Sequence, residues 1–393
     1  MNTLHRRYAE RMSLPTRSAS LVPALAAYGA LTLTFDIVPI LVPSTAEYYG
    51  VALSSGAWIY VMTDFGFGIA AFWYGIRSIR RRRLLLLGLG GLAIANLAAA
   101  GAPDFLTHLG ARTLAGYAMG AMVAGAMGLV VDGANIPRRV GTLTAVMPAA
   151  SVLMPVAGWV TAAHGWRTTL VSLAVIALAA LFVAFPMPEQ TSQEERIHPT
   201  RLFNRSATIG IASGVFWALG SMVPWVFVGA LAEGPVGGDA TLSGLALGVS
   251  GLAGFAAALA ARRLTFHNRT VGLQWGLVAC GLSVLWLVAT RDVPGFLLAI
   301  AAWAFSHWFV FVVYQGLFSE SVAVESQRGI LTFAALPLQV GYGLGAVVAS
   351  FVFQAWSFTG LGWVSAGLMV VSMGGAWWAW RDRSAVPTEI GST

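Results

Sequence analysis

Long runs of apolar residues, separated by short polar or basic segments, dominate the chain from residue 19 to residue 380. Each run is about 20 residues long, which is the length an α-helix needs to cross the hydrocarbon core of a bilayer. Several runs, among them 84–102, 141–163 and 168–187, contain no acidic or basic side chain, whereas a helix on the surface of a soluble protein shows a polar face. The pattern therefore predicts twelve transmembrane helices, over residues 19–42, 55–76, 84–102, 107–131, 141–163, 168–187, 207–231, 241–261, 270–290, 295–318, 329–353 and 360–380.

A polar segment at residues 188–206 divides the chain near its middle. The segments "RRVGTLTAVMP" from 138 and "SQRGILTFAALP" from 326 open the fifth and eleventh predicted helices and share G-x-L-T at an offset of 188 residues. Parallel repeats around a central cavity are a transporter architecture. We expect an all-α integral membrane protein with two pseudo-symmetric six-helix halves (19–187 and 207–380), a cytoplasmic central loop (188–206) and cytoplasmic tails (1–18 and 381–393).

Composition and charge support a membrane location. The chain is 57% hydrophobic and 10% charged, against about 25% charged residues in a globular domain. All 23 basic residues are arginine, which we ascribe mainly to GC-rich codons and hence to a GC-rich bacterium. All but Arg112, Arg167 and Arg291 fall on one side if the N-terminus is cytoplasmic, as the positive-inside rule requires. The net charge of +7 therefore indicates an inner-membrane, multi-pass protein with both termini in the cytoplasm, not a nucleic-acid binder.

Two features of the chain exclude other classes of protein. The first apolar run is too long for the core of a signal peptide and lacks a clear cleavage site, so we expect it to remain as a helix. The single cysteine, Cys280, lies in an apolar run, which excludes a disulfide framework and a cysteine metal site. We expect no cofactor and no metal.

Three segments resemble the major facilitator superfamily, and the likeness covers essentially the whole chain. "GIRSIRRRR" (75–83) is similar to the family's loop of a glycine, an acidic residue and a basic cluster, although Arg77 stands at the acidic position. "RTLAGYAMGA" (112–121) is similar to its R-x-x-x-G-x-x-x-G motif, and "PAASVLMPVAGWVTAAHGWR" (148–167) resembles the exporter motif, with Met154-Pro155 and Ala157-Gly158 in place of its Gly-Pro and Gly-Gly pairs. The resemblance implies a monomeric twelve-helix transporter that works by alternating access, closest to the proton-coupled drug and metabolite exporters.

Four titratable residues lie inside predicted helices, where a charge costs at least about 2.5 kcal/mol. Asp36 lies about six residues from the outer end of the first helix and Arg112 about five from that of the fourth, by the predicted boundaries. The resemblance implies that both helices line the cavity, so the two side chains could meet, either as a proton-coupling pair or as a permanent structural ion pair. Asp64 lies deeper and is a second candidate for proton transfer. His307 is near mid-membrane, where it either titrates near neutral pH or simply hydrogen-bonds to a neighbour.

Further charges lie at the predicted cytoplasmic helix ends. Asp132 is a candidate to pair with one of the arginines at 80–83 when the inner side is closed, and Glu320 is a candidate to pair with Arg262 or Arg263. The alternative, which we favour slightly, is that both carboxylates are solvated interfacial charges worth well under about 1 kcal/mol. The cytoplasmic gate candidates are Arg80, Arg81, Arg82, Arg83, Asp132, Arg262, Arg263 and Glu320.

Aromatic residues within the predicted helices suggest a large amphipathic cavity, because pockets for drug-sized molecules are mostly apolar with a few placed polar groups. Tryptophans near helix ends are usually interfacial anchors, as we expect for Trp377, Trp378 and Trp380. Glycines at 116, 120, 125 and 128 and at 244, 248, 251 and 254 are expected to let helices pack closely. The cavity candidates are Tyr60, Trp217, Trp225, Trp308, Tyr314 and Gln315.

Three functions are compatible with a chain of this kind: proton-coupled export of a small hydrophobic or amphipathic compound, proton-coupled import of a metabolite, and a membrane enzyme. An importer is expected to have a more polar binding site, so the few intramembrane charges favour export. An enzyme would need a catalytic cluster at a membrane interface, such as a histidine and an aspartate four residues apart on a loop. Among the six histidines only His108 has an aspartate at that spacing, Asp104, and we do not expect this single pair to form a catalytic cluster. The absence of lysine excludes a lysine-containing phosphate loop. We therefore predict a transporter whose partners are its substrate, protons and lipid.

Overall fold

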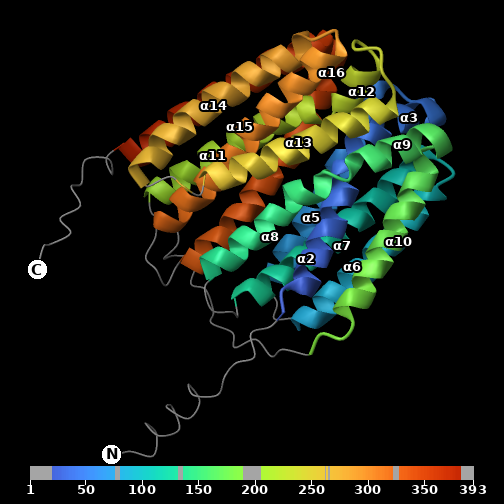
Figure 1. Cartoon of the computed structure of the whole chain (residues 1–393), viewed down its shortest axis with the longest axis horizontal. Helices are drawn as coiled ribbons and strands as arrows, with labels where there is room; N and C mark the ends of the chain where they lie inside the picture. The colour runs from blue at the N-terminus through green and yellow to red at the C-terminus, as the bar shows by residue number, and fades with distance from the viewer. Residues whose placement is uncertain are drawn as a thin grey trace, which may run out of the picture.

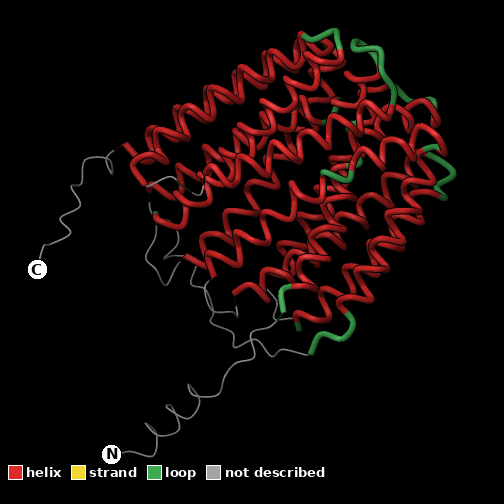
Figure 2. The backbone as a smooth tube through the Cα atoms, in the orientation of Figure 1, coloured by secondary structure: helices red, strands yellow, loops and turns green. Residues whose placement is uncertain are grey.

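The computed structural model describes residues 20–75, 80–131, 136–188, 205–261, 263, 266–321 and 327–381 of the 393-residue chain. Within these ranges the regular structure is entirely helical, as predicted. In a bilayer every backbone N–H and C=O must be paired internally, and an α-helix does this within each segment. Figure 2 shows the consequence: helices make up nearly all of the described backbone and short loops join them.

The helices form two groups that lie side by side, coloured blue to green and yellow-green to red in Figure 1. The first group contains α2 (Val22–Asp36), α3 (Val38–Tyr49), α4 (Leu53–Gly56), α5 (Trp58–Gly75), α6 (Arg81–Ala100), α7 (Phe105–Val131), α8 (Ile136–Ser151), α9 (Met154–His164) and α10 (Trp166–Ala184). The second contains α11 (Arg205–Trp225), α12 (Val228–Glu233), α13 (Ala240–Ala261), α14 (Phe266–Ala289), α15 (Val293–Glu320) and α16 (Gln327–Trp380). We call these groups the N half and the C half.

The described helices account for the twelve predicted spans. Eight of them are long and apolar enough to cross a membrane, and the bent pair α2 and α3 makes a ninth. Helices α5 and α7 correspond to the second and fourth predicted spans, and α16 contains both the eleventh and the twelfth. The fold is thus the predicted all-α membrane architecture.

The predicted end of the first span, at residue 42, is wrong. The chain bends by 43° at Ile37 and then continues as α3 to Tyr49. The polar residues Ser44 and Thr45 do not end the helix, because both hydroxyls donate to the Leu41 carbonyl oxygen, at 3.2 and 2.6 Å. Asp36 consequently lies at the bend in the middle of the span, well away from its outer end.

The bend recurs in the C half. Helix α11 ends at Trp225 and α12 begins at Val228, so this break lies about 190 residues after the break at Ile37, close to the 188-residue offset of the sequence repeat. The fifth span is also interrupted, at Val152–Leu153 between α8 and α9. Broken helices free backbone groups in mid-membrane, which is tolerated where the break is buried in protein.

Glycines bring helices into backbone contact, as predicted. A Cβ on Gly116 of α7 would collide with the Thr63 carbonyl oxygen of α5, and one on Gly66 of α5 would collide with the Thr113 carbonyl oxygen of α7. Small residues at such crossings replace the hydrophobic driving force that is missing between helices in lipid.

The two halves touch along two main seams. In the first, α13 of the C half packs on α8 and α9 of the N half, where Cβ atoms on Gly244 and Gly251 would meet the Met154 and Pro148 carbonyl oxygens. In the second, α16 packs on α4 and α5, and Ser350 donates to the Ser54 carbonyl oxygen at 2.9 Å. Helix α12 also packs on α3. The contacts made by α3, α4, α9 and α12 lie towards the membrane face that the predicted topology assigns to the outside.

One connection is made twice with the same backbone shape. Gly165 joins α9 to α10 with φ 81° and ψ 161°, and Ser357 joins the two spans within α16 with φ 53° and ψ −154°. This combination of positive φ with extended ψ is almost restricted to glycine, because a Cβ clashes with the backbone there. The C half therefore makes with serine a turn that the N half makes with glycine.

We expect Ser357→Gly to stabilise the protein by about 1 kcal/mol. The substitution relieves a backbone strain of about 1–3 kcal/mol, and the greater flexibility of glycine in the unfolded chain offsets part of this gain. The measurement is the unfolding temperature in detergent. Ser172→Gly, at an exposed position within α10, is the matched control and should lower the temperature. A drop with Ser357→Gly would contradict the strain assigned to this turn.

Candidate functional site

Asp64 is a carboxylate buried at the contact between the halves. It lies on α5 with only 4% of its surface exposed, and neither carboxylate oxygen has a hydrogen-bond partner among the described residues. Gly343 of α16 faces it: a Cβ there would come within 3.3 Å of the Asp64 Cβ. A larger residue at 343 would therefore press directly on Asp64.

Tyr60 lies one helical turn before Asp64 and is fully buried. Its ring packs edge-on against Phe35, with the centroids 5.4 Å apart. Its hydroxyl lies within electrostatic range of Asp36, Asp64 and Arg112, and close to the Trp225 indole of the C half. Since an indole N–H can only donate, Trp225 offers this hydroxyl no acceptor, and no other acceptor lies within hydrogen-bond distance of it among the described residues.

The C half contributes a stack of four aromatic rings from α11 and α15. The ring of His307 lies between those of Trp217 and Trp303, at centroid distances of 4.7 and 5.0 Å and interplanar angles of 26° and 22°. Trp303 in turn stacks on Trp225 at 5.0 Å and 22°. Residues 303 and 307 share a helix face because they are four apart. His307 is thus held between two indoles.

Tyr342 of α16 connects this stack to Asp64. Its ring centroid lies 6.3 Å from that of His307 and 6.1 Å from that of Trp217, and its phenol is within electrostatic range of Asp64. These residues lie near one another around both halves: the C-half rings are in contact, and Tyr342 is next to Gly343, which approaches Asp64. We call this group the central ring and define it, in order, as Asp64, Tyr60, Trp225, Trp303, His307 and Tyr342.

Asp36 and Arg112 have separate partners. The Asp36 carboxylate at the end of α2 accepts a hydrogen bond from the Ser151 hydroxyl at the end of α8. Arg112 is fully buried and donates to the Thr34 carbonyl oxygen at 3.2 Å and to the Asn96 side chain at 3.4 Å. No ion pair between the two is among the contacts of the described residues. Arg112 therefore joins α2, α6 and α7 by hydrogen bonds, a structural role that differs from the predicted ion pair with Asp36.

Three predicted cavity residues lie elsewhere. Tyr314 is fully buried in the C half, where its hydroxyl hydrogen-bonds with Ser213 at 2.6 Å and Ser372 at 2.9 Å. Trp308 lies over Gly254 of α13, where a Cβ would meet the indole. Gln315 is half-buried next to Tyr314. The first two pack within the C half and border the aromatic stack, since Trp308 lies 5.8 Å from the His307 ring and Tyr314 lies 5.7 Å from the Trp217 ring. Their place in a cavity stays a prediction.

The gate candidates are only partly within the described residues, since Asp132 and Arg262 lie outside them. Arg82 donates to the Phe185 carbonyl oxygen at 2.9 Å, which ties α6 to the end of α10. Arg80, Arg83 and Arg263 are exposed, and Arg81 lies against Gly128 of α7. Glu320 forms an ion pair with Arg269 of α14, a partner that we did not predict.

The sequence reasoning missed four residues that complete the site. They are Ser151, Trp303, Tyr342 and Gly343. Only Trp303 carried a usable signal, because it lies one helical turn before His307. The others depend on contacts between helices far apart in the sequence.

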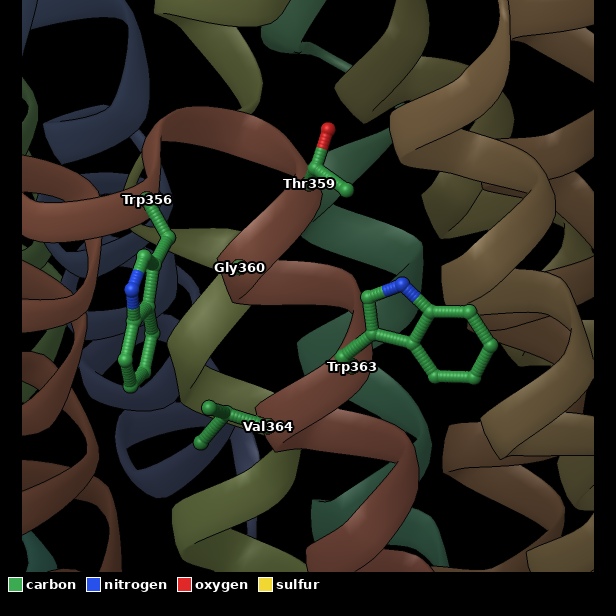
Figure 3. Close-up of a pocket in the computed structure, with 5 residues that line it drawn as sticks. All are labelled: Trp356, Thr359, Gly360, Trp363 and Val364. Carbon is green, nitrogen blue, oxygen red and sulfur yellow. The ribbon is translucent and has the colours of Figure 1, made fainter.

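A separate pocket of about 400 Å³ lies on α16, just after the Ser357 turn. Figure 3 shows two tryptophans of this helix, Trp356 and Trp363, pointing away from its axis, with Thr359, Gly360 and Val364 between them. Both indoles are about two-thirds exposed. No member of the central ring lines this pocket, and tryptophans at the end of a span are typical interfacial anchors.

Comparison with known proteins places this geometry in context. The family model described as Major Facilitator Superfamily matches residues 24–336, well over half of the chain. Two Bacillus subtilis (strain 168) proteins are similar, both described as uncharacterized MFS-type transporters. YbcL is 22% identical over 309 residues (75% of this chain and 78% of YbcL), and YceJ is 24% identical over 343 residues (82% and 86%). The crystal structure of a D-xylose-proton symporter has a similar fold, with a TM-score of 0.69 at 15% identity over 91% of this chain and 97% of the symporter.

We expect Arg112→Ala to lower the unfolding temperature and the folded yield in detergent strongly. The substitution leaves the Asn96 side chain and the Thr34 carbonyl buried without their donor, and each unpaired group lowers the free energy of unfolding by about 1–3 kcal/mol. Arg112→Lys should recover only part of the loss, because an ammonium group cannot reproduce the planar fork. Arg291→Ala, at an exposed loop position, should change little. A well-folded Arg112→Ala protein that has lost only transport would argue for a coupling role instead.

Proposed function

Since the chain belongs to the Major Facilitator Superfamily and is therefore a membrane transporter and not an enzyme, we propose that it exchanges protons for a small hydrophobic or amphipathic compound. The observation that carries this proposal is the Asp64 carboxyl, buried without a hydrogen-bond partner between the two halves. The halves rock around the central ring, and Asp64 carries the proton.

The cost of a buried charge supplies the coupling. A carboxylate among apolar groups is stabilised by opposite charges or hydrogen-bond donors, and the described residues offer Asp64 neither. The contact between Asp64 and Gly343 is therefore compatible with a neutral, protonated acid. When the proton leaves, the charge has to reach water, which favours separation of α5 from α16.

Asp36 is the second candidate for proton transfer. It lies at the bend between α2 and α3, half-buried, and Ser151 donates to it from the break between α8 and α9. Both helix pairs meet the C half, through α12 and α13 respectively. A change of charge at Asp36 would act on two broken helices at once, whereas Asp64 acts on one direct contact. We therefore rank Asp64 first.

The direction we propose is export. The central ring contains four aromatic residues and a histidine beside a single carboxylate, and such a lining suits apolar, flat substrates better than the polar metabolites that an importer would collect. In the predicted topology both termini are in the cytoplasm. The contacts between the halves made by α3, α9 and α12 then lie on the outer side of the membrane.

We expect Asp64→Asn to reduce substrate-driven proton movement in proteoliposomes to the background leak. Asparagine keeps the size of the side chain but cannot carry a proton, so the substrate should still bind and equilibrate. The measurement uses an internal pH dye and a panel of amphipathic compounds. Glu47→Gln, at an exposed position on α3, is the control and should match the wild type. Full proton movement in Asp64→Asn would move the carrier role to Asp36 or His307.

Everted membrane vesicles test the direction. With an inside-acid gradient, an exporter accumulates the compound in everted vesicles and an importer does so in right-side-out vesicles with an outside-acid gradient. Accumulation in everted vesicles supports export, and accumulation only in right-side-out vesicles supports import.

A further inference from the structure

The central ring contains an excess of buried hydrogen-bond donors. Among the described residues, three buried donors have no acceptor: the indole nitrogens of Trp217, which stacks on the ring, and of Trp303, and the Tyr60 hydroxyl, whose neighbour Trp225 can only donate. All three side chains are more than nine-tenths buried. An indole N–H can only donate, and a phenol donates readily, so all three groups are satisfied by acceptors and not by further donors.

Buried donors in folded proteins almost always have partners, and the exceptions need an explanation. Here the three groups come from both halves and gather around the central ring. His307 adds another unpartnered ring nitrogen between the two indoles. The simplest explanation is a ligand that supplies the missing acceptors.

The geometry of the ring indicates a flat ligand. Four rings already stack at 4.7–5.0 Å with interplanar angles of 22–26°, so the wall is built for planar groups. Two links of the ring cross between the halves: Tyr60 to Trp225, and Asp64 to Tyr342. When the halves separate, these two links open, and space for a ligand forms between Trp225 at the end of the stack and Tyr60.

We infer that the central ring binds an uncharged, planar aromatic compound that carries at least two hydrogen-bond acceptor oxygens of the carbonyl or ether type. The aromatic body enters at the Tyr60–Trp225 link and lies along the side of the four-ring wall, where its oxygens accept from the indole N–H groups of Trp303 and Trp217 and from the Tyr60 hydroxyl. This inference rests on the proposed function, since it takes the central ring to be the transport site.

The unpartnered Asp64 carboxylate alone would equally suit an organic cation held against aromatic faces. A cation without acceptor oxygens, however, leaves all the buried indole donors unsatisfied. It also occupies the carboxylate that the exchange cycle requires for the proton. An uncharged ligand satisfies the donors and leaves Asp64 to the proton.

The test compares three flat probes of similar size on the purified full-length protein in detergent. Flavone carries two acceptor oxygens, 2-phenylnaphthalene carries none, and N-methyl-2-phenylquinolinium is a cation without acceptor oxygens. Binding of tritiated flavone is followed by scintillation proximity, with the other two as competitors. The variants are Trp217→Phe and Trp303→Phe, which keep an aromatic face and remove only the donor. Trp275→Phe, at a position on α14 that is 71% exposed, is the matched control.

We expect flavone to bind more tightly than the other two probes, and each ring variant to weaken its binding about five- to tenfold, the loss of one hydrogen bond. Competition by 2-phenylnaphthalene should be unchanged in both variants, which shows that the aromatic wall is still folded. Trp275→Phe should match the wild type. Any of three results would overturn the inference. These are stronger binding of the hydrocarbon or the cation than of flavone, equal flavone binding by the wild type and both variants, and no binding of flavone.

Proton movement separates this inference from the proposed function. Flavone that binds through the indoles but drives no proton movement in proteoliposomes would leave the binding site standing and refute proton exchange. Proton movement driven by the quinolinium probe and not by flavone would support proton exchange and refute the assignment of the site to an uncharged ligand.

Discussion

A carboxylate without a partner, buried where two helix groups touch, sets the conditions that the rest of this molecule has to meet. The contact between Asp64 and Gly343 exists only because glycine leaves room for the acid, and the described neighbours offer it no hydrogen bond. A charge at that place is costly in a low-dielectric interior. The state of one proton therefore bears directly on whether α5 and α16 can stay together.

The remaining architecture makes such a contact reversible. Spans 1 and 7 are broken at equivalent positions, and span 5 is broken beside Asp36. Along α13, Gly244 and Gly251 let the backbone of the N half approach closely, and Gly248 leaves room for the Pro155 ring. Within the N half, in contrast, Arg112 fixes α2, α6 and α7 by hydrogen bonds. Each half is held together internally by specific contacts and meets the other over small residues.

The two halves contribute different kinds of side chain to the candidate site. The N half contributes Asp36, Tyr60 and Asp64, and the C half contributes the stacked rings and Tyr342. Neither half alone encloses the central ring. A substrate held there touches both, so its binding energy can favour one arrangement of the halves over another, which is what alternating access requires.

Some residues of the candidate site are visible in the sequence and others are not, for identifiable reasons. Asp64 and His307 stood out because a charged or titratable group in an apolar run is rare and costly. The bend at Ile37 was hidden, because Ser44 and Thr45 look like the polar end of a helix but donate to its own carbonyl oxygens. The Tyr314 hydroxyl joins α11, α15 and α16 through two serines, contacts that the sequence does not show.

The sequence by itself determined the twelve apolar spans, the two-half organisation and which side chains are costly to place inside a membrane, because span length and the cost of burying charge are local properties of the chain. Only the tertiary structure decided which residues meet. Asp36 takes Ser151 as its donor and not Arg112, and Asp64 faces a glycine some 280 residues away. Such pairings follow from helix rotation and from the positions of breaks. Hydropathy cannot report either, since in lipid nearly every face of these helices is apolar.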